Sequence, residues 1–347
     1  MTGSNGSLAD AYDLVIFDLD GVVYQGHDPI PGAIDAINGL VRAGKPVAYA
    51  TNNASRRADE VAALLRGIGV TADGHEVVTS AHASASLLAE KLPAGAPVLV
   101  VGGPALRAEV ADAGLTPVTE ASADGPKPAA VVQGYAADVG WAQLAEGCVA
   151  VRGGAWWVAT NADRTLPSPR GPLPGNGSLV AALATALGRQ PDVVVGKPAP
   201  TLFASAAARV GARQPLVVGD RLDTDIAGAV RAGFDGMVVL TGVSTAADVL
   251  AAPSGSRPTW IARDLAALAR AGVAARVPVV SENDMSAESG GWTVRRTDVG
   301  LELSGDGADV AALAALAAMA WQRPLAPDVI AAGASAATTL QLLGIAG

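Results

Sequence analysis

Short runs of apolar residues alternate along the chain with segments in which apolar residues recur at helical spacing. Apolar runs bounded by polar residues predict buried strands, and the segments between them predict amphipathic helices. The predicted strands are residues 13–17, 46–50, 98–101, 129–133, 156–160, 193–195, 216–218 and 236–240. The predicted helices include residues 34–42, 58–67, 81–91, 105–113 and 178–187. Strands that alternate with helices are typical of an α/β fold with a mostly parallel sheet.

The pattern changes beyond about residue 276. Residues 292–296 and 301–304 are predicted to form a hairpin, and one alanine-rich helix follows. The apolar run at residues 308–321 is too short to cross a bilayer, so it favours a buried helix and no membrane insertion. We therefore expect a separate C-terminal α+β appendage.

Length and charge narrow the classes of function. With 347 residues the chain is longer than a usual single domain, so two or three compact units are expected. A net charge of −9 provides no basic field for a phosphate backbone. We therefore expect no nucleic-acid partner.

The amino terminus and the cysteine content bear on location. The segment MTGSNGSLAD lacks a basic region followed by an apolar stretch, so it does not resemble a secretory signal and is expected to be a disordered tail. Cys148 is the single cysteine, which excludes an internal disulfide framework and fits a reducing compartment. A cytoplasmic protein is the expectation.

Four polar clusters each follow a predicted strand. They are Asp18-Leu19-Asp20-Gly21, Thr51-Asn52-Asn53, Gly196-Lys197-Pro198, and Gly219-Asp220 with Asp223 and Asp225. The carboxyl ends of parallel strands meet at one edge of a sheet, where ligands bind in open α/β folds. Attack on a phosphorus atom needs a nucleophile, a cation and donors to the phosphoryl oxygens. The clusters contain all of these groups, and together they predict a phosphoryl-transfer site.

The acidic residues suit distinct roles in such a site. Asp18 is the predicted nucleophile, because a carboxylate can form an acyl phosphate and divide hydrolysis into two displacements. Asp20 is predicted to protonate the leaving alkoxide and then to deprotonate the attacking water, which requires a raised pKa. With Asp220, these carboxylates form a set of hard oxygen ligands that suits Mg²⁺. Asp225 is expected to orient Lys197 or a metal-bound water.

The remaining polar residues are predicted to bind the phosphoryl group. Lys197 adds a fixed positive charge. Thr51, Asn52 and Asn53 offer hydroxyl, amide and main-chain donors, and Gly21 lets the main chain come close enough to donate as well. Each cluster alone also has a plain structural interpretation, as a strand-end turn, a helix cap or a loop. Their conjunction, each after an apolar strand, favours the functional interpretation.

The segments DLDGVV, ATNNAS, VGKPAP and VGDRLDTDI resemble the four motifs of the haloacid dehalogenase superfamily, and in particular those of its class IIA phosphatases. The resemblance covers residues 13–268. It implies a Rossmann-like, parallel-sheet core made of residues 1–79 and 191–275, with an α/β cap inserted at residues 80–190. Residues 276–347 remain as the appendage.

The resemblance also implies roles for individual residues. It implies an aspartyl-phosphate on Asp18, acid–base catalysis by Asp20, and Mg²⁺ held by Asp18, Asp220 and the main-chain carbonyl of Asp20. It implies phosphate binding by residues 51–53 and Lys197. An acid at position 20, where the transport ATPases of the superfamily have threonine, is typical of its phosphatases.

The segment TNADRTLPSPRGPLPGNGSL resembles the substrate-specificity loop of the family. Residues 166–177 within it hold too many prolines and glycines for regular structure. Its key position is Leu166, where pyridoxal phosphatases have histidine and the phosphoglycolate and glycerol-3-phosphate phosphatases have leucine. The resemblance therefore implies a small aliphatic phosphate ester, with glycerol 3-phosphate as the first candidate.

Alternative functions stay open at this point. 2-Phosphoglycolate, pyridoxal 5′-phosphate and nucleotide monophosphates are alternative substrates for the same core chemistry, and transfer to another alcohol in place of water is chemically possible. A catalytically silent binding module is an alternative of another class. The intact Asp18, Asp20, Lys197 and Asp220 argue against it.

The appendage carries no nucleophile, metal cluster or phosphate loop in its sequence, and we expect it to serve an interaction. Trp260, Trp292 and Trp321 lie in or near it and are candidates for anchoring a homo-oligomer. Packing within the chain is the commoner role of such side chains.

Overall fold

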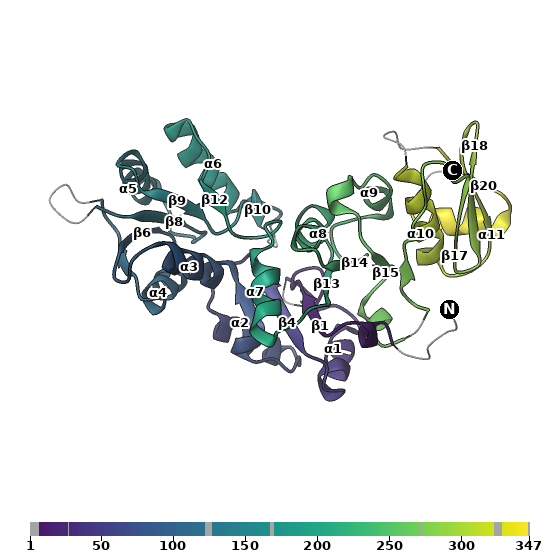
Figure 1. Ribbon diagram of the computed structural model, residues 1–347, viewed down its shortest axis with the longest axis horizontal. Coiled ribbons are helices and arrows are strands. Elements are labelled where there is room, and N and C mark those ends of the chain that lie inside the picture. Colours follow the sequence, from purple (N-terminus) through teal and green to yellow (C-terminus); the bar gives the residue numbers. More distant parts are fainter. Residues whose placement is uncertain are drawn as a thin grey trace. The chain divides into compact units, whose positions relative to one another are not determined.

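The computed structural model describes residues 7–26, 28–121, 127–166, 170–270, 272–322 and 328–345. The chain divides into two compact units, residues Met1–Val47 with Val210–Gly347, and residues Ala48–Arg209. Figure 1 labels helices and strands from both units. The predicted limits of the core, the cap and the appendage stay a prediction. Within the described ranges, no helix combines the length and the apolar character needed to cross a membrane.

The first unit contains a set of parallel strands. They are β1 (Leu14–Phe17), β13 (Pro215–Gly219), β14 (Asp235–Val239) and β15 (Trp260–Ala262), with β16 (Ala275–Arg276) antiparallel at the edge, in the order β16-β15-β14-β13-β1. Every residue of β1 and β13 is buried, as expected for strands covered on both faces. The parallel α/β core predicted from the apolar runs is thus confirmed.

Helices and short elements complete this part of the first unit. They are η1 (Leu8–Ala11), α1 (Ala33–Arg42), the π-helix η3 (Leu222–Ile226), α8 (Ala227–Ala232), α9 (Ala246–Leu250), η4 (Ser254–Ser256), η5 (Leu265–Leu268), and the strands β2 (Tyr24–Gln25) and β3 (Asp28–Pro29). The disordered tail predicted for the N-terminus is wrong near its end, because Leu8–Ala11 form a 3₁₀-helix in which Ala9 is buried. Residues 1–6 lie outside the described residues.

The C-terminal part of the first unit has its own sheet. Its elements are β17 (Ser286–Ser289), β18 (Trp292–Thr297), β19 (Gly300–Gly305), α10 (Asp309–Ala320), β20 (Val329–Ala331) and α11 (Ala334–Leu342), with strand order β17-β18-β19-β20. The predicted hairpin is confirmed as the antiparallel pair β18–β19, and β20 lies parallel to β19. The hairpin and the alanine-rich helix therefore belong to an α+β arrangement, as expected.

Helix α10 is buried on all sides, which confirms the buried helix predicted for the apolar run. Each residue from Val310 to Ala320 is buried. The helix packs against β17, β18 and β19 and also against β15, β16 and α9 (Figure 1). Its many alanines allow neighbouring elements to approach closely on every face. One apolar cluster consequently runs from Ile226 and Ile261 of the parallel core to Trp292 and Leu303 of the C-terminal sheet.

The tryptophans considered as oligomer anchors contribute to this packing. Trp292 is buried, and its indole N–H donates to the carbonyl of Ala308. The indole N–H of Trp321 donates to the carbonyl of Val249 on α9. These two side chains therefore stabilise the chain itself.

The second unit holds two groups of parallel strands. β4 (Val47–Thr51) pairs with β5 (Val77–Thr79), and a five-stranded sheet has the order β12-β9-β8-β6-β7. The strands of that sheet are β6 (Pro97–Val101), β7 (Thr116–Val118), β8 (Ala130–Gln133), β9 (Trp156–Ala159) and β12 (Val193–Val194). The helices are α2 (Ala58–Gly67), α3 (Ser80–Lys91), α4 (Pro104–Asp112), α5 (Trp141–Arg152), α6 (Asn176–Leu187) and α7 (Thr201–Val210), and η2 (Gly74–Glu76) is a 3₁₀-helix.

The segment predicted to lack regular structure contains a short hairpin. β10 (Thr165–Leu166) pairs in antiparallel fashion with β11 (Leu173–Pro174), and α6 begins at Asn176 rather than at Ser178. The expectation for residues 166–177 is therefore wrong at both ends. Prolines are compatible with such short edge pairs, because one side of an edge strand needs no hydrogen bond. Residues 167–169 lie outside the described residues.

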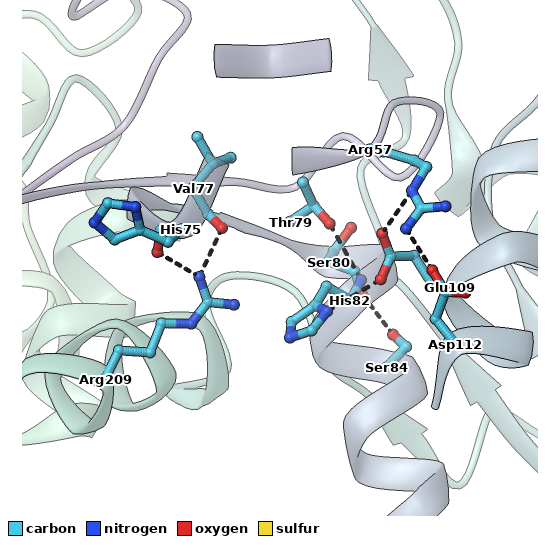
Figure 2. Close-up of polar contacts among 10 residues, drawn as sticks. All are labelled: Arg57, His75, Val77, Thr79, Ser80, His82, Ser84, Glu109, Asp112 and Arg209. Atoms are coloured by element: carbon cyan, nitrogen blue, oxygen red, sulfur yellow. Dashed lines mark hydrogen bonds and ion pairs between the residues drawn. The ribbon is translucent and has the colours of Figure 1, made fainter. Parts of the chain in front are cut away.

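Polar contacts fix the start of α3, as Figure 2 shows. The hydroxyl of Thr79 accepts a hydrogen bond from the main-chain N–H of His82 at 3.1 Å and so caps the helix. The hydroxyl of Ser84 donates to the carbonyl of Ser80 at 2.7 Å. Nδ1 of His82 lies 3.0 Å from Oε2 of the buried Glu109 on α4. These contacts hold the first turn of α3 in a defined place in the second unit.

Two arginines tie this region to its neighbours (Figure 2). Nε of Arg57, at the start of α2, lies 3.6 Å from Oε1 of Glu109. The guanidinium of Arg209, on α7, donates to the carbonyls of His75 and Val77 at 2.9 Å each. The buried carboxylate of Glu109 thus has a charged partner in Arg57, which a buried charge requires.

Candidate functional site

β1 and β13 place two of the predicted metal-binding carboxylates next to each other. The strands pair in parallel with Phe17 opposite Val218, and the main-chain N–H of Asp18 donates to the carbonyl of Val218 at 2.9 Å. Asp18 and Asp220 therefore leave adjacent strands at their carboxyl ends. This is the edge at which open parallel sheets bind ligands.

Asp225 joins this pair from the π-helix η3. Carboxylate oxygens of Asp18, Asp220 and Asp225 all lie within 4.8 Å of one another, and Asp220 and Asp225 are buried. The Asp225 carboxylate also accepts a hydrogen bond from the main-chain N–H of Arg221 at 3.1 Å. The sequence predicted Asp225 as a supporting residue, and the structure brings its carboxylate to the predicted metal ligands.

Two glycines make room for the Asp220 side chain. A Cβ atom at either Gly21 or Gly242 would overlap the Asp220 carboxylate, and Gly21 has a φ of +79°. The main-chain N–H of Val243 donates to Oδ2 of Asp220 at 2.7 Å, and the Thr241 hydroxyl donates to the carbonyl of Gly21 at 2.6 Å. The loops after β1 and β14 therefore close around this carboxylate and fix its direction.

The three carboxylates fit a divalent cation. Three acidic side chains this close together, two of them buried, repel one another strongly unless a positive charge lies among them. Hard carboxylate oxygens are the ligands that Mg²⁺ and Ca²⁺ prefer, and Mg²⁺ retains several waters when it binds. The donor set of Asp18, Asp220 and Asp225 thus suits an ion of the predicted kind.

Asp20 lies on the turn that follows β1, two residues beyond Asp18. Its side chain is half-buried. The turn is closed by a hydrogen bond from the N–H of Gly21 to the carbonyl of Tyr24 at 2.8 Å. Burial raises the pKa of the Asp20 carboxyl, against the opposing effect of main-chain hydrogen bonds from Gly26 and Gly21. The direction of this shift is the one that a general acid requires.

The other predicted site residues belong to the second unit. Thr51 ends β4 and is buried, and its hydroxyl accepts a hydrogen bond from the N–H of Asn53 at 3.1 Å. The side chain of Asn53 accepts hydrogen bonds from the N–H and the hydroxyl of Ser55 at 2.8 and 2.7 Å. Lys197 is only 4% exposed. Leu166 lies on β10, opposite Leu173 of β11.

Asn52 and Lys197 are in direct contact. Oδ1 of Asn52 accepts a hydrogen bond from the N–H of Lys197 at 2.7 Å, and Nδ2 donates to the carbonyl of Lys197 at 3.1 Å. Within the second unit, the structure thus joins two residues that the sequence predicted for the same site. The predicted contribution of Asp225 to the placement of Lys197 involves residues of both units and stays a prediction.

Sequence reasoning missed several residues that hold these groups. Asp163 accepts hydrogen bonds from Nδ2 of Asn52, and Asn161 donates to the carbonyl of Asn52. Gly242 and Val243 hold Asp220. The sequence held a signal for these residues. Asn161 and Asp163 follow β9, and Gly242 and Val243 follow β14, just as the four predicted polar clusters follow their strands.

Two family models match the chain in the regions that carry these residues. A model described as haloacid dehalogenase-like hydrolase matches residues 15–116, and one described as HAD-hydrolase-like matches residues 194–268. The first range includes the segments after β1 and β4. The second includes Lys197 and the segment after β13.

Curated relatives with phosphatase names are similar over most of the chain. A D-glycerol 3-phosphate phosphatase of Mycobacterium tuberculosis is 52% identical over 262 residues, which are 76% of this chain and 72% of the relative. An acid sugar phosphatase of Staphylococcus aureus is 38% identical over 240 residues, which are 69% of this chain and 90% of the relative.

Solved structures of phosphatases are similar as well. The crystal structure of a glycerol phosphate phosphatase from M. tuberculosis in complex with magnesium has a TM-score of 0.89 and 42% identity, and the match covers 98% of this chain and 100% of that one. A p-nitrophenyl phosphatase from Archaeoglobus fulgidus has a TM-score of 0.67 and 29% identity over 73% of this chain and 97% of that one.

Proposed function

The chain belongs to the haloacid dehalogenase-like hydrolases, and from this premise we propose that it is a Mg²⁺-dependent phosphatase whose first substrate is glycerol 3-phosphate. The observation that carries the proposal is the cluster of Asp18, Asp220 and Asp225 at the carboxyl ends of β1 and β13. The cluster combines a nucleophile with the ligands of a cation. A carboxylate that reacts with phosphorus needs both.

The proposed reaction has two displacements. Asp18 attacks the phosphorus atom, the bond from phosphorus to the ester oxygen breaks, and the leaving alkoxide takes a proton from Asp20. Water then gives a proton back to Asp20 and attacks the same phosphorus atom, which releases inorganic phosphate and restores the Asp18 carboxylate. A raised pKa of Asp20 favours the protonated form needed for the first step.

A divalent cation bound by Asp18, Asp220 and Asp225 would offset repulsion between the nucleophile and the phosphate dianion. The main-chain carbonyl of Asp20 is a further proposed ligand. We assign phosphate binding to Lys197, to the hydroxyl of Thr51, to the main-chain N–H of Asn52 and to the donors of Asn53, with main-chain donation near Gly21. The magnesium and calcium complexes of the M. tuberculosis phosphatase support a divalent ion.

The names of the relatives support the substrate. One acts on D-glycerol 3-phosphate, and another is called an acid sugar phosphatase. Both names indicate small, polar phosphate esters. The aliphatic side chain of Leu166, which we propose as a selecting residue in a cap of residues 80–190, is compatible with an aliphatic substrate. 2-Phosphoglycolate, pyridoxal 5′-phosphate and nucleotide monophosphates remain the alternatives to be compared.

Location and assembly are part of the proposal. The low cysteine content supports a cytoplasmic protein. Homo-oligomers are common among soluble enzymes, and an exposed Trp141 on α5 is a candidate contact. Sedimentation of the purified chain would establish the number of subunits.

A panel of phosphate esters tests the substrate. Release of inorganic phosphate with Mg²⁺ would be measured from glycerol 3-phosphate, 2-phosphoglycolate, pyridoxal 5′-phosphate and uridine monophosphate. The highest kcat/KM is expected for glycerol 3-phosphate. Preference for another ester would retain the chemistry and reject the substrate, and no release from any ester would favour a silent binding module.

Replacement of Asp20 separates proton transfer from nucleophilic attack. For Asp20→Asn we expect kcat for glycerol 3-phosphate to fall by about 10²–10⁴-fold, because its alkoxide leaving group needs a proton. The loss should be smaller for p-nitrophenyl phosphate, whose phenolate leaves without one. Steady-state rates with both esters measure the difference. Equal losses for the two esters would argue against Asp20 as the general acid.

Removal of the cation should abolish activity and lower thermal stability. After chelation, the carboxylates of the cluster repel one another more strongly, so the melting temperature is expected to fall and to recover when Mg²⁺ is added. Asp220→Asn should lose most of the Mg²⁺-dependent rise in melting temperature. Asp298→Asn, at an exposed acid on the turn after β18, is the matched control and should retain it. A full rise in Asp220→Asn would contradict the assigned ligand.

A further inference from the structure

We infer that Asn52 is a positioning residue that holds the main chain of Lys197 against residues 160–164, the segment after β9. This segment leads into the loop that carries Leu166, the proposed selecting residue, so the same loop places the lysine. The inference rests on the proposed phosphatase function, since it assigns a role through Lys197. It assigns to the amide of Asn52 a task different from a direct bond to phosphate.

Both amide hydrogens and the amide oxygen of Asn52 form hydrogen bonds inside the protein. Its oxygen accepts from the N–H of Lys197 at 2.7 Å. Its nitrogen donates to the carbonyl of Lys197 at 3.1 Å and to the two carboxylate oxygens of Asp163 at 3.2 and 3.1 Å. An amide nitrogen has two hydrogens, and these two partners account for both. The side chain therefore holds the main chain of Lys197 at both its N–H and its carbonyl.

The main chain of Asn52 is held just as firmly. Its carbonyl accepts hydrogen bonds from the hydroxyl of Ser80 at 2.6 Å and from Nδ2 of Asn161 at 2.7 Å. Ser80 lies in the first turn of α3, which the capping contacts in Figure 2 fix in place. Asn52 thus meets the segment after β9 twice, through Asn161 and through Asp163.

The segment after β9 is itself anchored to α6. Nδ2 of the buried Asn176 donates to the carbonyl of Asn161 at 2.8 Å, and the N–H of Gly177 donates to the carbonyl of Asp163 at 2.8 Å. The hydroxyl of Ser178 donates to the carbonyl of Arg164 at 2.7 Å. These contacts leave little freedom between the start of α6 and the residues that hold Asn52.

Close packing at Gly196 prevents Lys197 from moving independently. A Cβ atom at Gly196 would lie 2.6 Å from Oδ1 of Asn52 and 2.6 Å from the carbonyl oxygen of Thr160. The N–H of Gly196 donates to that carbonyl at 2.8 Å. Only a glycine fits there, and the lysine that follows is placed by the same segment. A shift of residues 160–164 on substrate binding would therefore move Lys197 through Asn52.

Replacement of Asn52 by alanine tests this contact in two independent ways, by kinetics and by hydrogen exchange. Asn52→Ala should lower kcat/KM by about 10–100-fold, because a misplaced catalytic charge loses much of its effect. It should weaken competitive inhibition by inorganic phosphate about tenfold. Hydrogen exchange of the peptide that carries Gly196 and Lys197 should accelerate, since the Lys197 N–H loses its acceptor. Asn283→Ala, an exposed asparagine of the first unit, is the control and should change neither readout.

A reciprocal exchange identifies the pair. Asn52→Asp and Asp163→Asn should each reduce kcat/KM, and in Asn52→Asp two carboxylates then face each other. The double variant restores one donor and one acceptor and should recover at least about threefold over Asn52→Asp. The inference would be overturned if Asn52→Ala changed neither the hydrogen exchange nor the kinetics. It would also be overturned if the losses in kcat/KM of the two single variants simply multiplied in the double variant. If the wild type released no phosphate, the proposed function would fail. The exchange measurement would still show whether Asn52 holds the main chain of Lys197.

Discussion

Asp18→Asn is expected to abolish phosphate release from every ester, with a loss in kcat on the order of 10⁴-fold or more. An amide at this position cannot form the acyl phosphate on which both displacements depend. The same change removes one of three neighbouring negative charges. The metal-free variant should therefore melt at a temperature equal to or above that of the metal-free wild type.

A nearby acid provides the matched control for this variant. Asp223 lies between Asp220 and Asp225 in sequence, but it is exposed, and its carboxylate accepts hydrogen bonds from the guanidinium of Arg221 at 3.0 and 2.8 Å. Asp223→Asn should retain a rate within about threefold of wild type, because surface ion pairs contribute little. Turnover by Asp18→Asn at more than a few per cent of the wild-type rate would exclude Asp18 as nucleophile.

The second large effect is expected in α10. Leu316→Asp should destabilise the first unit by about 3–5 kcal/mol or leave it insoluble, because a carboxylate would replace a fully buried side chain that has apolar neighbours on every face. Deletion of residues 277–347 should have a similar outcome, since it uncovers Ile226, Val238 and Ile261. Thermal unfolding and the soluble fraction measure both changes.

An exposed leucine on the neighbouring helix serves as the control. Leu342 on α11 is 65% exposed, and Leu342→Asp should leave the melting temperature within about 2 °C of wild type. A soluble, cooperatively folded protein without residues 277–347 would show that the C-terminal sheet is an independent appendage. The continuous apolar cluster predicts that it is not.

Apolar runs and strand-end polar residues were sufficient to predict the parallel core. Buried parallel strands are apolar along their whole length, so β1, β4 and β13 stand out in the sequence, and each delivers its polar cluster directly at its end. The proximity of Asp18 and Asp220 followed from this rule alone. Asp225 was predicted as a supporting residue, and the structure shows that the π-helix brings its carboxylate as close as those of the predicted metal ligands Asp18 and Asp220.

Other features could not be predicted because they depend on distant partners. The hydrogen bonds of Asn52 reach residues 111 and 145 positions away, and no local pattern marks such pairs. Helix α10 has no polar face, so its sequence indicates burial without indicating which elements surround it. β20 is only three residues long, and a run of that length is lost among loops.

Detection of the phosphoryl-enzyme tests the central claim most directly. Asp20→Asn would be mixed with Mg²⁺ and p-nitrophenyl phosphate, quenched during turnover, digested and analysed by mass spectrometry. Without its base for water, the variant should accumulate a hydroxylamine-labile phosphoryl group on the peptide that contains Asp18. Release of phosphate with no adduct at any stage of turnover, or an adduct on a residue other than Asp18, would contradict the account.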